Sequence, residues 1–389
     1  MIHANSDSIY LDNNATTAML PEVRSAMLAV MDAGALNPSS IHSRGDHARA
    51  LLKEARRSVS QMLDSSERSV TFTSGATEAN QLVLQNLLQG AFGGFRLVTT
   101  STEHSSIREA LPALRRAGVD VQIASVGRNG VVSLEEIEAA ILPGQTLVSV
   151  QWANNETGVL QPIQAIGEVC RRHRAVLHSD AVQAVGKVPV DLNHASLLSV
   201  SGHKLHGPLG VGALVAAEGI QLSATLAGGG QESGLRPGTE NLPAIVGMGQ
   251  ACRIRSARFE VSNERVRSLR DAFEAGLRQA GVIEDVAGAS TARLPNTSNI
   301  RVRSVDGEAL LIQLNRAGVA CSQSSACTNR KPEPSFVLRA MGLSEDEAFR
   351  SIRFGFSELN TFEEVDRVVD LVVEIHTRLL PFFAQRPVA

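Results

Sequence analysis

The sequence predicts an α/β protein with a mostly parallel main sheet and a second, smaller α+β domain. Short apolar runs rich in Val, Ile and Thr alternate with segments of helical periodicity, which is typical of βα units. The runs are apolar on both faces, as in a sheet covered by helices on both sides. The composition changes after about residue 255, so we expect a large domain over residues 15–258 and a small domain formed by residues 1–14 and 259–389.

The large domain is expected to contain six strands, separated by helices. The strand candidates are 69–74, 96–101, 146–153, 175–180, 197–201 and 211–217. Helical patterns cover 75–91 and 163–173, and a charged amphipathic segment at 264–281 opens the small domain. The last helix is expected to begin at Thr361, because Thr361 and Glu364 form a Thr-x-x-Glu capping box before apolar residues at helical spacing.

Composition limits the classes of function. The 389 residues, 43% of them hydrophobic, are enough to bury a large core. The net charge is −3 with both signs interspersed, so we expect no direct contact with nucleic acid or an anionic membrane. The sequence shows no signal peptide and no run of about 18 apolar residues. Four cysteines are too few for a disulfide framework, and we expect a cytoplasmic protein.

Polar residues follow the strand candidates, and in open α/β sheets ligands bind beyond the carboxyl ends of the strands. Ala76 and Thr77 follow the first strand and open a helix, where small residues and free backbone N–H groups suit a phosphate. An ordinary tight turn is the alternative at this position. Taken alone, the pattern leaves both interpretations open.

Lys204 follows the strand at 197–201, within Ser201-Gly202-His203-Lys204. Burial lowers the pKa of a lysine and favours the neutral amine that a Schiff base requires. The alternative is a lysine that extends from the strand end into solvent.

Asp180 ends the strand at 175–180, and Gln183 lies three residues further on. A buried carboxylate needs a partner, and the protonated ring nitrogen of a heterocyclic cofactor would supply one. A helix N-cap is the alternative role for Asp180.

His104 and Asn155 follow two further strand candidates. His104 is placed to lie over a cofactor ring and to take part in proton transfer, and a structural histidine is the alternative. The phosphate site, the lysine, the carboxylate and the histidine together indicate a pyridoxal phosphate enzyme.

Ten motifs in order carry a family resemblance. They are YLDNNATT, NPSSIH, FTSGATEAN, TEHSSI, WANNETGV, HSDAVQAVGK, SGHKLHGP, GGGQESGLRPGT, SSACT and SIRF. Across essentially the whole chain the sequence resembles the group I cysteine desulfurases of the NifS/IscS type. The resemblance implies a homodimeric pyridoxal 5'-phosphate enzyme of fold type I, with a mostly parallel seven-stranded sheet, that converts L-cysteine to L-alanine and leaves a persulfide on a cysteine.

The resemblance also implies residue roles. Lys204 would bind the cofactor covalently, Asp180 would pair with its ring nitrogen, and Gln183 with its ring hydroxyl. Its phosphate would be held by Ala76, Thr77, Ser201 and His203, and by Thr239 from the other subunit. His104 would stack on the ring, and Asn155 and Arg353 would bind the substrate carboxylate.

Cys327, in SSACT, would be the nucleophile, on a loop at about 320–334. It would pass its sulfur to an acceptor protein, with iron–sulfur cluster assembly the default and tRNA thiolation or DNA phosphorothioation the alternatives. We expect no resident metal, although Cys327 could ligate an iron–sulfur cluster during transfer. Cys321 is expected to be a structural residue at the end of a strand.

Two other functions stay open. A selenocysteine lyase or another class V pyridoxal phosphate enzyme would share Lys204 and Asp180 without needing Cys327. A non-enzymatic metal or sulfur scaffold would use Cys321, Cys327 and the pair Cys170 and His173, but the sequence lacks the paired C-x₂-C spacing of a zinc site.

Overall fold

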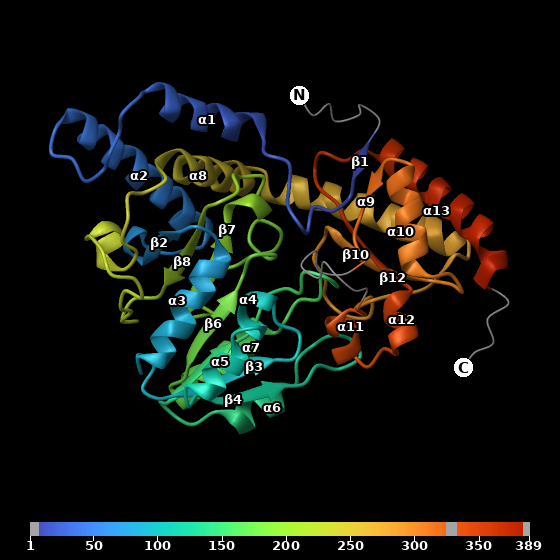
Figure 1. Ribbon diagram of the computed structural model, residues 1–389, viewed down its shortest axis with the longest axis horizontal. Coiled ribbons are helices and arrows are strands. Elements are labelled where there is room, and N and C mark those ends of the chain that lie inside the picture. Colours follow the sequence, from blue (N-terminus) through green and yellow to red (C-terminus); the bar gives the residue numbers. More distant parts are fainter. Residues whose placement is uncertain (1–7, 324–332, 384–389) are drawn as a thin grey trace.

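The computed structural model describes residues 8–323 and 333–383. It contains a seven-stranded sheet and a three-stranded sheet, which lie in different halves of the molecule (Figure 1). The large sheet has the order β2-β8-β7-β6-β5-β3-β4. Its strands are β2 (Val70–Thr73), β3 (Arg96–Thr100), β4 (Asp120–Ala124), β5 (Thr146–Ser149), β6 (Val176–Asp180), β7 (Leu197–Ser201) and β8 (Gly212–Ala216).

The large sheet is parallel except at β8, which runs antiparallel to both β2 and β7. This confirms the α/β class and the mostly parallel seven-stranded sheet. All six strand candidates are strands, within a few residues of the expected ends. β4 was not expected, because this edge strand alternates exposed and buried residues instead of forming an apolar run.

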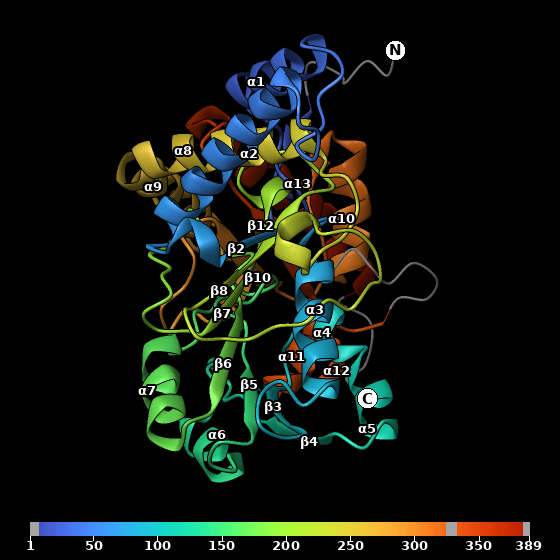
Figure 2. The ribbon, with the colours of Figure 1, turned by 90° about the vertical axis from the view of Figure 1, so that its left-hand side faces the viewer.

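Helices cover both faces of the large sheet (Figure 2). One face carries α6 (Leu134–Ala140) and α7 (Ile163–His173), while α3 (Ala76–Leu88), α4 (Ser105–Arg108) and α5 (Leu111–Arg116) lie on the other. The apolar side chains between sheet and helices form two clusters, centred on residues such as Ile166 and Val148 on one face and Leu84 and Leu97 on the other. The helix expected at 163–173 has those bounds.

Three further helices pack together near the edge of the large sheet that is formed by β2. They are α1 (Pro21–Asp32), α2 (Ser43–Met62) and α8 (Leu242–Ala257). Short 3₁₀ turns occur at η1 (Glu67–Ser69), η2 (Gly202–Lys204) and η3 (Gln231–Gly234). No helix in residues 8–323 and 333–383 is long and apolar enough to cross a membrane.

The second sheet is antiparallel, with β10 (Thr297–Val302) between β9 (Ile283–Val286) and β12 (Ser351–Gly355). It packs with α9 (Phe259–Gln279), α10 (Gly307–Arg316) and α13 (Phe362–Phe383) around Phe273, whose ring centroid lies 4.7 Å from that of Phe354. A short parallel pair, β1 (Ile9–Tyr10) and β11 (Val319–Ala320), joins this half. The expected capping box of α13 is present, because each of Thr361 and Glu364 donates its backbone N–H to the other's side chain, at 3.2 Å.

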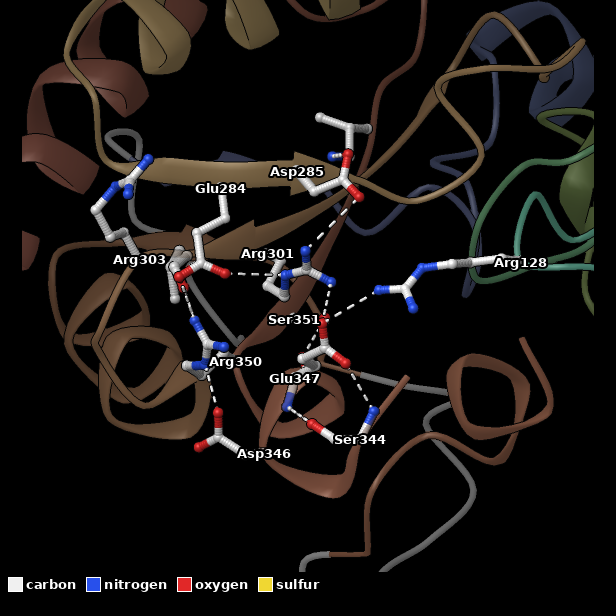
Figure 3. A network of polar contacts seen from close by, with 12 residues as sticks. Arg128, Glu284, Asp285, Arg301, Arg303, Ser344, Asp346, Glu347, Arg350 and Ser351 are labelled. Carbon is white, nitrogen blue, oxygen red and sulfur yellow. Dashed lines mark hydrogen bonds and ion pairs between the residues drawn. The ribbon is translucent and has the colours of Figure 1, made fainter. Parts of the chain in front are cut away.

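α11 (Phe336–Ala340) and α12 (Glu345–Phe349) connect the two halves. Val337 and Leu338 of α11 belong to the apolar cluster of the large sheet. α12 also takes part in a polar network centred on Arg301 of β10 (Figure 3). The Arg301 guanidinium lies 3.1 Å from carboxylate oxygens of both Glu284 and Glu347, and Arg128, after β4, reaches Glu347 at 3.4 Å.

Candidate active site

A cavity of about 390 Å³ lies at the carboxyl ends of β3, β5, β6 and β7. Because these strands are parallel, the residues that follow them meet at one edge of the sheet. The predicted site residues that line the cavity are Ala76, Thr77, His104, Asn155, Asp180, Gln183, Ser201, His203, Lys204 and Arg353. Residues expected from separate motifs therefore share one site.

Lys204 lies in η2, directly after β7. Its Nζ donates to the backbone carbonyls of Asn14 and Ala15, at 2.6 Å each. Lys204 also lines the cavity and is half-buried, so it does not extend freely into solvent. The alternative of a solvent-directed lysine is therefore wrong.

Asp180 is 7% exposed and is held on both of its carboxylate oxygens. Asn80 of α3 donates to Oδ2 at 2.8 Å, and the backbone N–H of Val182 donates to Oδ1 at 3.1 Å. Residues 182–186 form turns instead of a helix, so Asp180 is not a helix N-cap. The carboxylate is fixed at the base of the cavity, where a protonated ring nitrogen would complement its charge.

His104 caps the N-terminus of α4. Its Nδ1 accepts the backbone N–H of Ser106 at 3.2 Å, which places the proton of a neutral ring on Nε2. Burial lowers the pKa of His104; Asp180 opposes the effect and Lys204 adds to it. Its imidazole is therefore neutral at pH 7, with the proton on Nε2.

The phosphate side of the cavity combines the start of α3 with the segment after β7. Thr77 lies in the first turn of α3, and Ser201 and His203 also line the cavity. Burial, together with Lys204 and Lys187, lowers the pKa of His203 to about 4, so its ring is neutral. Backbone N–H groups of a helix N-terminus, two hydroxyls and an imidazole form a donor set that suits a phosphate.

Arg353 reaches the cavity from β12, in the other half of the molecule. It is 2% exposed; its Nη2 lies 2.7 Å from Asp12 Oδ1, and its Nη1 donates to the backbone carbonyl of Asn155 at 3.1 Å. Its buried Nε has no hydrogen-bond partner among the described residues. A buried guanidinium held on one side by Asp12 suits a substrate carboxylate.

Three residues of the site were not expected from the sequence. Asp12 pairs with Arg353, Asn80 bridges Asp180 and the Ser106 hydroxyl, and Glu103 is buried directly before His104. All three lie inside the quoted motifs, in YLDNNATT, FTSGATEAN and TEHSSI. The motifs were the only signal for Asp12 and Asn80, whereas Glu103 also follows the strand candidate 96–101, directly before His104.

Two predicted site residues are not placed in the cavity. Thr239 is exposed, in the segment between η3 and α8, and does not line the cavity of its own chain. Cys327 lies outside the described residues. Cys321 is the first residue after β11, is half-buried, and packs against the apolar cluster of the second sheet; burial raises the pKa of its thiol.

The cysteine scaffold finds no support in the described residues. Cys170 is buried in α7, where burial raises its pKa to about 12, and His173 contacts Glu138. Within residues 8–323 and 333–383 no three His, Cys, Asp or Glu side chains form a group that could hold a metal.

Comparisons with known proteins agree with this geometry. Residues 9–368 match the family model of the class V aminotransferases. A cysteine desulfurase of Gluconacetobacter diazotrophicus is 39% identical over 377 residues, which cover 96% of this chain and 94% of that protein.

Two solved structures share the fold over nearly their full length. A NifS-like protein has a TM-score of 0.89 at 32% identity, with 96% of this chain and 100% of that chain covered. The structure titled SspA in complex with cysteine has a TM-score of 0.80 at 31% identity, with 90% and 99% covered. The chain therefore belongs to the class V aminotransferase family, as a pyridoxal phosphate-dependent cysteine desulfurase of the NifS/IscS type.

Proposed function

We propose that the chain converts L-cysteine to L-alanine and transfers the sulfur to Cys327 as a persulfide. The observation that supports this most directly is the meeting of Lys204, Asp180, His104 and Arg353 in one cavity. The structural relative titled as a complex with cysteine supports the choice of substrate.

The residues of the cavity fit pyridoxal phosphate. Thr77, Ser201 and His203, with the first backbone N–H groups of α3, would hold its phosphate, Asp180 its ring nitrogen, and Lys204 its reactive carbon. When bound, the cofactor supplies an electron sink for bonds that break at the substrate.

Proton movements fall to Lys204 and His104. Both line the cavity, and burial favours the neutral form of His104. The neutral Lys204 amine would remove the α-proton of cysteine, with His104 Nε2 as the second group that can donate or accept a proton. Arg353 and Asn155 would hold the substrate carboxylate during these steps.

Sulfur transfer is proposed as an attack by the Cys327 thiolate on the substrate sulfur. The S–S bond forms as the substrate Cβ–S bond breaks, and the electron pair of that bond stays with the carbon skeleton. The sulfur is thereby oxidised, and the carbon skeleton takes up a proton at Cβ to give alanine.

The test is incubation with cysteine without reductant, followed by measurement of alanine and of the peptide masses. We expect one alanine for each sulfur atom added to the peptide that contains Cys327. Cys327→Ser should lose both products, whereas the matched variant Cys321→Ala should keep both. Alanine release without added sulfur on Cys327, or full turnover by Cys327→Ser, would contradict the persulfide step and favour a selenocysteine lyase or another class V enzyme.

The cofactor lysine has its own test. Borohydride reduction of the loaded protein should attach the cofactor to the peptide of Lys204 and to no other peptide. Attachment elsewhere would overturn the assignment of Lys204.

We further propose a cytoplasmic homodimer with two domains, residues 15–258 and residues 1–14 with 259–389. The exposed position of Thr239, away from the cavity of its own chain, agrees with a role in the partner's phosphate site. The partner in sulfur transfer would be an acceptor protein, an iron–sulfur scaffold or a thiolation protein. Direct contact with nucleic acid or a membrane is not part of the proposal.

A further inference from the structure

Lys187 is a second lysine close to Lys204. It follows β6 and Gln183, and it lines a small cavity of about 20 Å³ that Lys204 also lines. Arg255 and Glu358 face the same cavity and form an ion pair with each other at 3.2 Å, and His206 completes its titratable lining. No carboxylate lies within ion-pair distance of Lys187 in the described part of the chain.

A continuous chain of hydrogen bonds joins the two lysines. Lys187 Nζ donates to the backbone carbonyl of Gln183 at 3.0 Å and to its Oε1 at 3.4 Å. Gln183 Nε2 donates to the carbonyl of Asn14 at 2.9 Å, and Lys204 Nζ donates to that same carbonyl at 2.6 Å. Because Oε1 faces an amine that can only donate when charged, the amide of Gln183 has one orientation that satisfies both of its ends.

The two amines also interact through their charges. Burial lowers the pKa of Lys187, with the nearby cations Lys204 and Arg255 adding to the effect, to about 7. The interaction is mutual, so a positive charge on Lys187 disfavours a positive charge on Lys204.

We propose that Lys187 is a positioning residue for Lys204: it orients Gln183 and, when charged, disfavours a positive charge on Lys204. The inference rests on the proposed role of Lys204. It adds that the neighbouring Lys187 influences the charge of the Lys204 amine. Gln183 is the connecting group, since it contacts Lys187 at one end and shares the Asn14 carbonyl with Lys204 at the other.

The test compares Lys187→Met with Lys187→Arg and with Lys53→Met, an exposed lysine on α2. One measurement follows the visible absorbance of the cofactor-loaded protein as a function of pH. The other labels the cofactor-free protein with trace acetic anhydride across pH and quantifies the peptide of Lys204. The sequence contains four lysines, at 53, 187, 204 and 331, so each labelled peptide is readily assigned.

Lys187→Met carries no charge at this position, whereas Lys187→Arg is charged at every pH of the titration. Both titration midpoints should therefore be higher in Lys187→Met than in Lys187→Arg, by roughly 0.5–1 pH unit. Lys53→Met should behave as the wild type. Equal midpoints in Lys187→Met and Lys187→Arg would overturn the inference. If Lys187→Met does not fold, Lys187→Gln gives the same comparison.

Failure of this inference can be told from failure of the proposed function. If borohydride attaches the cofactor to Lys204 but Lys187→Met and Lys187→Arg have equal midpoints, only the role of Lys187 is wrong. If the cofactor attaches elsewhere, the proposed assignment of Lys204 is wrong, and labelling of the cofactor-free protein still measures whether the two lysines are coupled.

Discussion

At the scale of single residues, Arg353 shows how a buried charge is prepared for a ligand. Asp12 and the Asn155 carbonyl hold its two Nη atoms, so the guanidinium is oriented before any substrate arrives. Preorganisation of this kind reduces the entropy lost when a carboxylate binds.

Asp12→Asn is expected to weaken substrate binding. A hydrogen bond to a charged group contributes about 1.5–3 kcal/mol, so the KM for cysteine should rise at least about tenfold, with a smaller change in kcat. Steady-state kinetics would measure both. Asp32→Asn, at an exposed position at the end of α1, is the matched control and should behave as the wild type. An unchanged KM in Asp12→Asn would show that the ion pair does not orient Arg353.

Glu103 gives a prediction about pH. It is 1% exposed; its carboxylate accepts hydrogen bonds from Thr100 and from the backbone of Gln151, yet burial raises its pKa to about 8, with Asp180 adding to the effect. The folded protein therefore binds more protons than the unfolded chain between about pH 4.5 and 8. Its contribution to stability is complete below pH 4.5 and is lost as the pH rises toward 8.

Glu103→Gln keeps a hydrogen-bond acceptor and removes the titration. The free energy of unfolding of the wild type should fall by up to about 1.4 kcal/mol per pH unit more steeply than that of the variant. Urea unfolding at several pH values would compare the slopes, with the exposed Glu109→Gln as control. Equal slopes in wild type and Glu103→Gln would mean that Glu103 is ionised in the folded protein.

The site residues that the sequence predicted differ from those that it did not predict in what determines their positions. Asp180 ends one buried strand and Lys204 follows another, so their place at the carboxyl ends of the strands follows from topology alone. Asn80 reaches Asp180 only because α3 packs on the sheet with that side of the helix inward. The rotation of a helix about its axis depends on tertiary packing, which a single sequence does not state.

At the scale of elements, the strands beneath the cavity were predictable because helices cover both of their faces. β5 and β7 have no exposed residue, and a run of Leu and Val interrupted only by small Ser and Thr residues is the consequence. The burial pattern of the strands did not predict that β12 contributes a residue to the cavity. Its residue Arg353 is buried because the two halves of the chain meet at the cavity, and only the family resemblance pointed to it.

The network around Arg301 predicts how the second sheet is held against α12 (Figure 3). The Arg301 side chain is 14% exposed and contacts Glu284 of β9 and Glu347 of α12. Arg301→Met would leave these carboxylates without their shared cation, so the free energy of unfolding should fall by about 1–2 kcal/mol.

Urea unfolding followed by circular dichroism would measure this change. Arg303→Met is the matched control, because Arg303 is exposed and its side chain donates only to the backbone carbonyl of Gly281 among the described residues. High salt should narrow the difference between the wild type and Arg301→Met. Equal stability of the two arginine variants would contradict the role assigned to Arg301.

At the scale of the whole molecule, exposed apolar side chains support the proposed dimer. Ile41, between α1 and α2, is 97% exposed, and Leu226, after β8, is 61% exposed. Figure 1 places both segments at the same end of the molecule, and the segment after β8 also carries Thr239. Exposed apolar groups at one end are typical of a surface that pairs with another chain.

Sedimentation velocity should therefore show a dimer for the wild type and a shift toward monomer for Ile41→Asp. Val261→Asp on α9 is the matched control, since Val261 is 80% exposed on a different helix. Dissociation by Val261→Asp as readily as by Ile41→Asp, or a monomeric wild type, would contradict the proposed arrangement.

Because residues from both sheets line the cavity, the distance between the sheets could report whether a ligand is bound. Asp180 ends β6 and Lys204 follows β7 of the seven-stranded sheet, whereas Arg353 belongs to β12 of the three-stranded sheet. If a ligand that binds both Arg353 and Lys204 brings the sheets closer, spin labels at the exposed Ile123 of β4 and Ile312 of α10 would record that approach as a shorter distance. The fraction of protein with bound ligand could then be determined from the distance between the spin labels, without a measurement of catalytic turnover.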